Sequence, residues 1–140
     1  MNVFIVGAGP GDPELITVKG QKLLSEADVI IYAGSLVNPA LLDYAKAGCE
    51  IHNSASMTLP QVINVIEDSV KQGKMVVRLH TGDPSIYGAI QEQMDALDKL
   101  GIEYKVVPGV SSFLATAAAL KQEYTLPGIS QTVIITRNEG

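Results

Sequence analysis

Short runs of β-branched residues alternate with helix-length segments along most of the chain, and this alternation constrains the fold more than any other feature. The five runs are dense in Val and Ile: residues 3–6, 28–32, 50–53, 75–79 and 103–107. Such runs are typical of strands that are buried on both faces of a parallel sheet. Parallel neighbours need crossover connections, so the order predicts an α/β fold: an open, mostly parallel five-stranded sheet with helices on both faces.

The segments between these runs carry helical spacing. In residues 59–72, apolar residues recur at i, i+4 and i+8, and Thr58 with Gln61 three positions later resembles a capping box. In residues 85–100, apolar residues form a second stripe, and Gly101 follows as a stop signal. Helices are also expected in three further segments: residues 14–26, 39–47 and 111–121.

The pattern changes after the last predicted helix, and this change divides the chain. Residues 1–121 form the predicted N-terminal α/β domain, which would hold both cofactor and substrate contacts. Residues 122–130 contain Pro and Gly without periodicity and are interpreted as a linker. Residues 131–137 are predicted as a sixth strand that has nothing to cover it. We therefore interpret residues 131–140 as the start of a second domain and the chain as a piece of a longer protein.

Charge and cysteine content exclude several classes of partner. The formal net charge is -5, from 10 Lys plus Arg against 15 Asp plus Glu. This balance argues against nucleic acid and anionic membrane surfaces, which are bound through clustered basic residues. No apolar run approaches the about 18 residues of a membrane span, and the N-terminus lacks a basic leader. Cys49 is the only cysteine, which fits a reducing compartment, and we expect a cytoplasmic protein.

Four loops are expected at the edge of the sheet where ligands bind, beyond the carboxyl ends of the strands. They are residues 7–13, 33–36, 80–88 and 108–112, and three of them are rich in Gly and Pro. Glycine lets backbone amides and carbonyls approach a ligand closely. Together the loops predict a cleft for a small polar ligand that is built largely from backbone atoms.

Common nucleotide and catalytic motifs are not found in these loops. Asp12 or Glu14 stands where a dinucleotide fingerprint needs its third glycine, and Pro10 and Pro13 remove amide donors that a pyrophosphate would need. No glycine-rich loop ends in Lys-Ser or Lys-Thr, as a P-loop does. No Gly-x-Ser-x-Gly elbow occurs, so a hydrolase triad has no nucleophile turn.

Metal-ligating residues are few and separated. Cys49, His52 and His80 are the only soft candidates, and the first two fall near the entry of the third predicted strand. That end of the sheet is opposite the cleft loops. We therefore expect no metal site.

Two side chains stand out in residues 80–88. Asp83 lies between Gly82 and Pro84, where it either caps the following helix or anchors a ligand, and the residues alone leave both readings open. Tyr87 belongs to the same loop and is a further candidate contact. We also expect Gly82→Val to block the cleft while leaving the fold nearly intact.

Three loop motifs together resemble those of the tetrapyrrole methylase family, whose members use S-adenosylmethionine. They are VGAGPGDPELIT at residues 6–17, HTGDPSIYG at residues 80–88 and PGVSS at residues 108–112, in the family's order. Residues 32–37 (YAGSLV) and 131–137 (QTVIITR) most resemble the branch that methylates carbon 11 of precorrin-4 or cobalt-precorrin-4 in cobalamin biosynthesis.

The resemblance implies a two-domain C-methyltransferase, usually homodimeric, with S-adenosylmethionine folded into a cleft and converted to S-adenosylhomocysteine. The implied cofactor contacts are Pro10, Thr81, Gly82, Asp83, Ile86, Ser111 and Ser112. The implied substrate contacts are Gly9, Gly11, Ser35 and Tyr87. No catalytic residue is assigned, because Ala33 and Gly34 stand where many relatives carry an acid. On this reading the 140-residue chain alone is inactive.

The substrate implied by the resemblance is a small-molecule tetrapyrrole with several carboxylates. Such a substrate favours Arg or Lys at the cleft rim, and Arg78 and Arg137 are the candidates whose direction stays open. Whether the ring already holds cobalt is also open. The alternatives are a uroporphyrinogen, other precorrin, diphthine or rRNA methyltransferase of the same family, or a noncatalytic nucleotide-binding domain. The net charge of -5 argues against the rRNA alternative.

Overall fold

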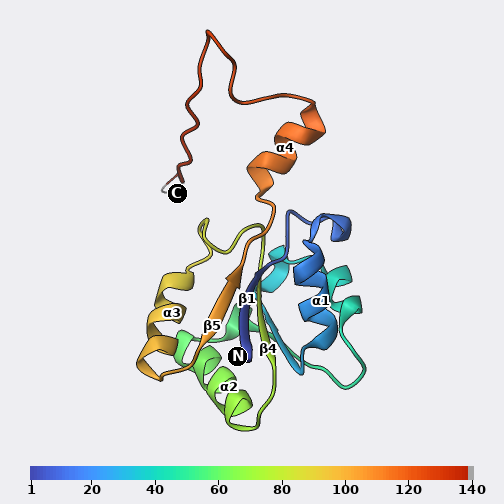
Figure 1. The fold of residues 1–140 in the computed structure, drawn as a ribbon, viewed down its shortest axis with the longest axis vertical. Helices are drawn as coiled ribbons and strands as arrows, with labels where there is room; N and C mark the ends of the chain where they lie inside the picture. The colour runs from blue at the N-terminus through green and yellow to red at the C-terminus, as the bar shows by residue number, and fades with distance from the viewer. Residues whose placement is uncertain (139–140) are drawn as a thin grey trace.

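Five parallel strands form one sheet in the order β3-β2-β4-β1-β5 (Figure 1). The computed structural model describes residues 1–138. The strands are β1 (Val3–Gly7), β2 (Val29–Tyr32), β3 (Glu50–Asn53), β4 (Val76–His80) and β5 (Tyr104–Val107). Each strand end lies within one residue of its prediction. The α/β prediction is therefore confirmed.

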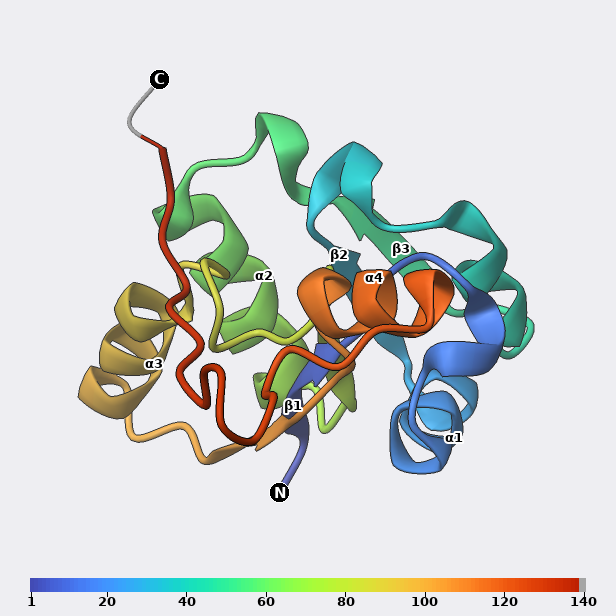
Figure 2. The ribbon, with the colours of Figure 1, turned by 90° about the horizontal axis from the view of Figure 1, so that it is seen from above.

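Helices cover both faces of the sheet, as predicted. They are α1 (Val18–Glu26), α2 (Leu59–Lys71), α3 (Ile90–Lys99) and α4 (Ser112–Leu120). In Figure 2, α1 lies on one side of the sheet, and α2 and α3 lie on the other. The helix α4 instead projects beyond the carboxyl ends of the strands (Figure 1).

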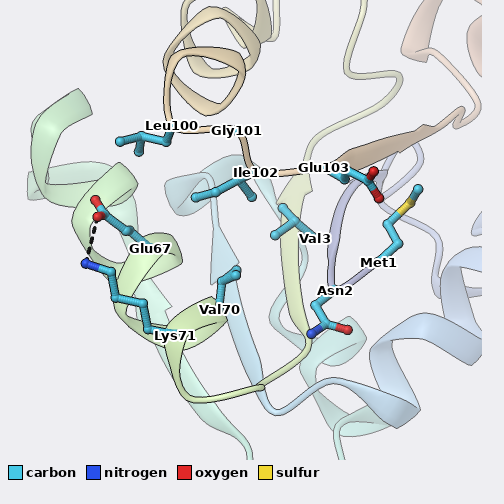
Figure 3. A pocket seen from close by; sticks show the side chains of 10 residues that line it. All are labelled: Met1, Asn2, Val3, Glu67, Val70, Lys71, Leu100, Gly101, Ile102 and Glu103. Carbon is cyan, nitrogen blue, oxygen red and sulfur yellow. Dashed lines mark ion pairs between the residues drawn. The ribbon is translucent and has the colours of Figure 1, made fainter.

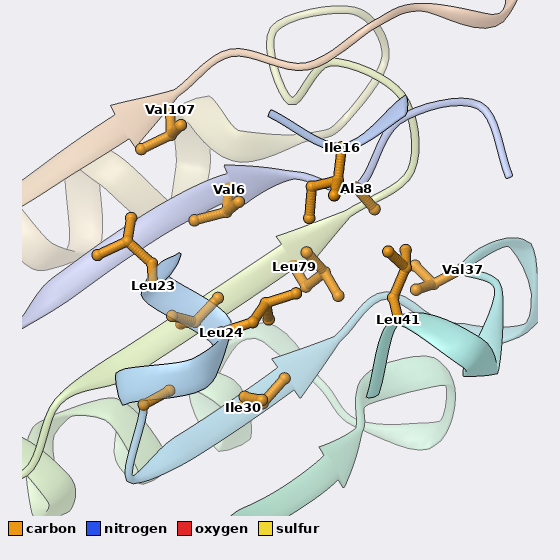
Figure 4. Close-up of a cluster of buried hydrophobic side chains, with 12 residues drawn as sticks. Val6, Ala8, Ile16, Leu23, Leu24, Ile30, Val37, Leu41, Leu79 and Val107 are labelled. Atoms are coloured by element: carbon orange, nitrogen blue, oxygen red, sulfur yellow. The ribbon is translucent and has the colours of Figure 1, made fainter. Parts of the chain in front are cut away.

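Two buried clusters, one on each face, hold the layers together. The central strand β4 supplies Val77 and Leu79 to the cluster under α1 (Figure 4) and Val76 to the cluster under α2 and α3. This division follows from the alternation of side chains along a strand. All five residues of β4 are buried, and these include the polar side chains of Arg78 and His80.

The helix α2 has the predicted capping box. The Thr58 hydroxyl accepts a hydrogen bond from the Gln61 amide at 3.3 Å, and the Gln61 side chain accepts one from the Thr58 amide at 2.8 Å. These two bonds satisfy amides that have no partner inside the helix. The predicted helix 59–72 is thus confirmed to within one residue.

Three predicted helices differ from the structure. The start of residues 14–26 overlaps the 3₁₀ helix Pro13–Leu15, and α1 begins only at Val18. The Thr17 hydroxyl caps α1 by accepting from the Gly20 amide at 2.9 Å. Residues 39–47 form the 3₁₀ helix Pro39–Tyr44. The helix predicted over residues 85–100 begins at Ile90.

A left-handed turn delays the start of α3. Tyr87 has φ 56° and Ala89 has φ 52°, so neither residue is in the helical region. A Cβ on Gly88 would lie 2.1 Å from the Pro84 carbonyl oxygen, so this turn closes tightly on itself. The helical stripe in the sequence could therefore not continue back to residue 85.

The sixth strand predicted at residues 131–137 is not formed within residues 1–138. This segment is extended, but within residues 1–138 it pairs with no strand, and a strand needs a hydrogen-bonded neighbour. Val133, Ile134 and Ile135 are all exposed. In the preceding segment, Leu126 and Ser130 close one tight turn.

Every helix within residues 1–138 is too short or too polar to cross a membrane.

Candidate ligand-binding cleft

The glycine loops that follow β1, β4 and β5 meet at the carboxyl edge of the sheet, as the sequence predicted. Gly9 and Gly82 exchange two backbone hydrogen bonds, with N–O distances of 3.2 Å and 2.8 Å. The Gly109 amide donates to the Asp83 carboxylate at 2.9 Å. The three loops are therefore joined directly to one another.

The loops approach so closely that side chains do not fit between them. A Cβ on Gly109 would lie 2.2 Å from the Gly82 carbonyl oxygen and 2.9 Å from the Gly7 Cα. A Cβ on Gly7 would lie 2.7 Å from the Gly109 Cα. Real Cβ atoms do not make such contacts, so Gly7 and Gly109 are required by packing of backbone on backbone.

A cleft of about 390 Å³ opens beside this junction, between the loop after β4 and the start of α4. Its volume is in the range of small-molecule sites. The cleft is lined by Ala33, Leu36, His80, Thr81, Gly82, Asp83, Ile86, Tyr87, Gly88, Ser111, Ser112 and Phe113. The lining thus combines hydroxyl groups and exposed backbone with a few apolar side chains.

Six of the seven cofactor residues implied by the sequence line the cleft, as does the implied substrate residue Tyr87. Pro10 is not one of the lining residues. It belongs to the loop after β1, which is hydrogen-bonded to the loop after β4. Gly9 in that loop pairs with Gly82, and the Gly11 carbonyl accepts from the Asn38 side chain at 2.7 Å. Ser35 also lies outside the lining, next to Leu36 in a single 3₁₀ turn.

Sequence reasoning missed five lining residues: Ala33, Leu36, His80, Gly88 and Phe113. All five lie in or beside the four predicted loops. His80 ends β4, and its sequence context indicates only a possible metal ligand. The structure groups no three metal-ligating side chains within residues 1–138.

Asp83 does not cap a helix, because α3 begins only at Ile90 and has Ala89 at its N-cap. One Asp83 carboxylate oxygen accepts from the Ser85 amide at 2.8 Å, and the other accepts from the Gly109 amide at 2.9 Å. The side chain therefore stabilises a local turn and ties the loop after β4 to the loop after β5. The helix-cap reading is wrong.

Gly82 has a left-handed backbone, with φ 62°, which revises the expectation for Gly82→Val. A Cβ there would lie 3.7 Å from the Ser111 Cα, so space alone is not limiting. We expect Gly82→Ala to lower the free energy of unfolding by about 1–2 kcal/mol and Gly82→Val to lower it further, because β-branched residues disfavour this conformation. Urea unfolding measures this; wild-type stability in Gly82→Val would contradict it.

Arg78 points away from the cleft rim, into the layer between the sheet and α3. Its Nε donates to the Gln93 side-chain oxygen at 2.9 Å, and Nη1 donates to the Ile31 carbonyl at 3.2 Å. Burial lowers the pKa of Arg78 to about 10, so the guanidinium stays charged at neutral pH. The other rim candidate, Arg137, lies with its guanidinium carbon 5.9 Å from the centre of the Tyr87 ring, at the cleft.

His80 lies at the floor of the cleft and is neutral at physiological pH. Burial, and next the charge of Arg78, lowers the pKa of His80 to about 4. Above pH 6.5 neither the folded nor the unfolded state binds this proton, and stability is complete. Between about pH 6.5 and 4 only the unfolded state binds it, so stability falls as pH falls.

We therefore expect His80 to reduce the free energy of unfolding by about 3 kcal/mol between pH 6.5 and pH 4. Urea unfolding at a series of pH values measures this loss in the wild type and in His80→Leu, which has no imidazole. The same pH dependence in both proteins would contradict the assignment to His80.

A second cavity, of about 430 Å³, lies at the opposite edge of the sheet (Figure 3). It is lined by residues that precede β1 and β5 and by the ends of α2 and α3. Two of its charged side chains, Glu67 and Lys71, already form an ion pair at 2.8 Å. Because open parallel sheets bind ligands beyond the carboxyl ends of their strands, the cleft at that edge is the stronger candidate.

Comparison with known proteins gives a consistent set of relatives. The family described as "Tetrapyrrole (Corrin/Porphyrin) Methylases" matches residues 2–140. The chain is 67% identical over 138 residues to the cobalt-precorrin-4 C(11)-methyltransferase of Methanocaldococcus jannaschii, which covers 99% of this chain and 53% of that protein. It is 52% identical over 137 residues to the precorrin-4 C(11)-methyltransferase of Pseudomonas aeruginosa, with 98% and 54% covered.

Solved structures agree with these relatives. An X-ray structure of a cobalt precorrin-4 methyltransferase matches with a TM-score of 0.96 and 53% identity, over 99% of this chain and 58% of that one. A uroporphyrin-III C-methyl transferase from Thermus thermophilus, complexed with S-adenosyl homocysteine, matches with a TM-score of 0.77 and 34% identity, over 94% and 53%. The chain spans about half the length of the curated relatives it matches.

Proposed function

The chain belongs to the tetrapyrrole methylase family, and for this reason we propose that it supplies the cofactor cleft of an S-adenosylmethionine-dependent C-methyltransferase. The substrate in this proposal is precorrin-4 or cobalt-precorrin-4, methylated at C-11 in cobalamin biosynthesis. The observation that carries the proposal is the 67% identity to a protein of that name, which extends over 99% of this chain. The joined glycine loops line the cleft in which we place the cofactor.

The cleft suits a cofactor that is held mainly through hydrogen bonds and shape. Ser111 and Ser112 bring hydroxyl groups from the start of α4, and Gly82 leaves backbone atoms exposed. Ile86 and Phe113 supply apolar surface. Of the side chains that line the cleft within residues 1–138, Asp83 is the only carboxylate, and both its oxygens accept backbone hydrogen bonds.

When bound, S-adenosylmethionine supplies an electrophilic methyl group on a sulfonium sulfur. The contribution of the protein is then orientation, which alone lowers a barrier by roughly 7–11 kcal/mol in favourable cases. We assign cofactor contacts to Thr81, Gly82, Asp83, Ile86, Ser111 and Ser112, with Pro10 behind them. Gly9, Gly11, Ser35 and Tyr87 are proposed to contact the tetrapyrrole. A neutral His80 is a weak base, so no general base is assigned.

Further proposals concern the whole protein. Residues 131–140 are proposed to begin a second domain, after residues 1–121 and the linker 122–130. The curated relatives are about twice as long as this chain, and the exposed apolar residues Val133, Ile134 and Ile135 need a cover. We also propose a cytoplasmic homodimer without nucleic-acid or membrane partners.

Methyl transfer by the full-length protein tests this function. With methyl-labelled S-adenosylmethionine, the label is expected on C-11 of precorrin-4 or of cobalt-precorrin-4, and the comparison of the two substrates decides between them. Transfer to uroporphyrinogen III in place of both would contradict the proposed substrate. Binding of ATP or NAD without S-adenosylhomocysteine would contradict the proposed cofactor.

Asp83→Ala should weaken cofactor binding more than it weakens the fold. Loss of the carboxylate leaves the Gly109 amide without its partner, which costs about 1 kcal/mol of stability. The two loops then separate where they line the cleft, and we expect S-adenosylhomocysteine affinity to fall about 30-fold. Calorimetry gives the affinity, and urea unfolding gives the stability.

Asp12→Ala is the matched control. Asp12 precedes Pro13 and accepts from the Glu14 amide at 2.9 Å, as Asp83 precedes Pro84 and accepts from Ser85. Within residues 1–138, however, the Asp12 side chain bonds to no second loop. Its loss should leave cofactor affinity close to that of the wild type. Equal losses of affinity in the two variants would refute the tie between loops as the cause.

A further inference from the structure

Three buried polar side chains form a connected chain beneath the cleft, and the proposed function leaves them unused. Arg78, His80 and Gln93 are 6%, 5% and 5% exposed. Arg78 Nε donates to Gln93 Oε1 at 2.9 Å, and Gln93 Nε2 lies 3.3 Å from His80 Nε2. Arg78 makes no ion pair within residues 1–138. Burying a cation without a carboxylate partner costs folding free energy, so the presence of Arg78 at this position calls for an explanation.

The hydrogen bonds that join Arg78, Gln93 and His80 can run in one direction only. A guanidinium has donors and no acceptor, so the atom of Gln93 that meets Arg78 must be the carbonyl oxygen. The Gln93 NH₂ group then points at His80 Nε2 and also donates to the Ala89 carbonyl at 3.3 Å. Because an NH₂ group cannot accept, His80 Nε2 must be the acceptor, without a proton.

We propose that Arg78 and Gln93 are positioning residues that hold His80 as its neutral Nδ1–H tautomer, so that His80 offers a hydrogen-bond donor to the ligand in the cleft. Neutral imidazole carries one proton, which therefore lies on Nδ1. Nδ1 makes no hydrogen bond to the part of the chain that the structure describes, and His80 lines the cleft. The matching ligand atom is an acceptor, such as a carboxylate oxygen or a ring nitrogen.

Burial and the neighbouring Arg78 keep the imidazole neutral. Arg78 on β4 is the charged group that acts on His80, and Gln93 on α3 contributes a neutral amide. Burial and the guanidinium both disfavour the imidazolium. The buried arginine thus has two effects on His80: it fixes the amide that selects the tautomer, and it opposes protonation.

The tautomer is measurable without any ligand. In ¹⁵N-histidine-labelled full-length protein at about pH 8, where imidazoles are neutral, His80 should show a protonated Nδ1 and an unprotonated Nε2. His52 is an internal reference, because its Nε2 lies 2.8 Å from a Glu50 carboxylate oxygen and must donate. The two histidines should therefore show opposite tautomers. A protonated Nε2 on His80 would overturn the proposal.

Gln93→Glu reverses the selection with little change of shape. A carboxylate accepts from both Arg78 and His80, so His80 should change to the Nε2–H tautomer, and its pKa should rise by about 1–3 pH units. Gln91→Glu makes the same substitution on the exposed side of α3 and should leave His80 unchanged. An unchanged His80 tautomer in Gln93→Glu would contradict the role of Gln93.

The contact with the ligand rests on the proposed function and has its own test. His80→Leu removes the donor and should weaken S-adenosylhomocysteine binding about three- to tenfold. His80→Asn places an amide NH₂ near the position of Nδ1 and should bind within about twofold of the wild type. Wild-type affinity in His80→Leu would overturn the contact. If the wild type does not bind S-adenosylhomocysteine, the proposed function fails, whereas the tautomer measurement still decides the state of His80.

Discussion

Gly109→Ala should destabilise the protein by about 3 kcal/mol or more, the largest effect on folding that we expect from a single methyl group. The new Cβ would lie 2.2 Å from the Gly82 carbonyl oxygen and 2.9 Å from the Gly7 Cα. Both neighbours are backbone atoms in hydrogen-bonded loops, so neither can move by a change of rotamer. The loops would have to separate, and the cleft that they line would open.

Gly20→Ala is the control for adding a methyl group at a glycine. A Cβ on Gly20 would lie 3.0 Å from the Ile16 Cγ1 and 3.1 Å from the Thr17 hydroxyl, so it would meet side-chain atoms, which yield more easily than backbone. Because Gly20 lies in α1, alanine also gains helix propensity of about 1 kcal/mol. We expect stability within about 1 kcal/mol of the wild type.

Urea unfolding of both variants measures these effects, and a midpoint that shifts without a change of slope identifies a change of stability. If Gly109→Ala were as stable as Gly20→Ala, the close packing of the three glycine loops would be contradicted. Loss of cofactor binding should accompany the loss of stability, because Gly82 lines the cleft.

The strands were predictable because burial on both faces leaves a direct trace in the sequence. Val29, Ile30 and Ile31 in β2 are fully buried on opposite sides of the sheet, and such a short run of β-branched residues favours a strand. The loops at the carboxyl edge then followed from topology. Their glycines predict backbone contact between the loops, and Gly7 and Gly109 make that contact.

The start of α3 was not predictable from apolar spacing. Ile86 continues the helical stripe in the sequence, but in the structure it lines the cleft instead of packing under a helix. Gly88 closes against the Pro84 carbonyl, and Tyr87 and Ala89 adopt positive φ. The turn at the cleft thus delays the helix although the apolar spacing of the sequence continues through it. Only the Gly and Pro content of the loop indicated this delay.

The polar contacts of the site depend on residues that are distant in the sequence. Asp83 bonds to Gly109, 26 positions away, and Arg78 bonds to Gln93, 15 positions away. Local patterns do not encode such pairs, because they arise only when loops and layers pack. For the same reason, the sequence did not show that Arg78 lies inside the layer under α3 rather than at the rim.

Ser112→Trp tests most directly whether the cleft holds the cofactor. Ser112 lines the cleft from the first turn of α4 and is exposed, so a larger side chain fills the cleft without disturbing the core. Thr116→Trp is the matched control, because Thr116 is exposed on the same helix, one turn further on, outside the cleft lining. Thermal unfolding should leave both variants close to the wild type.

Calorimetric titration of the full-length proteins with S-adenosylhomocysteine gives the deciding comparison. We predict that Ser112→Trp raises the Kd about 100-fold or more, equivalent to about 2.7 kcal/mol, and that Thr116→Trp leaves it unchanged. Wild-type affinity in a folded Ser112→Trp protein would contradict the assignment of the cofactor to this cleft.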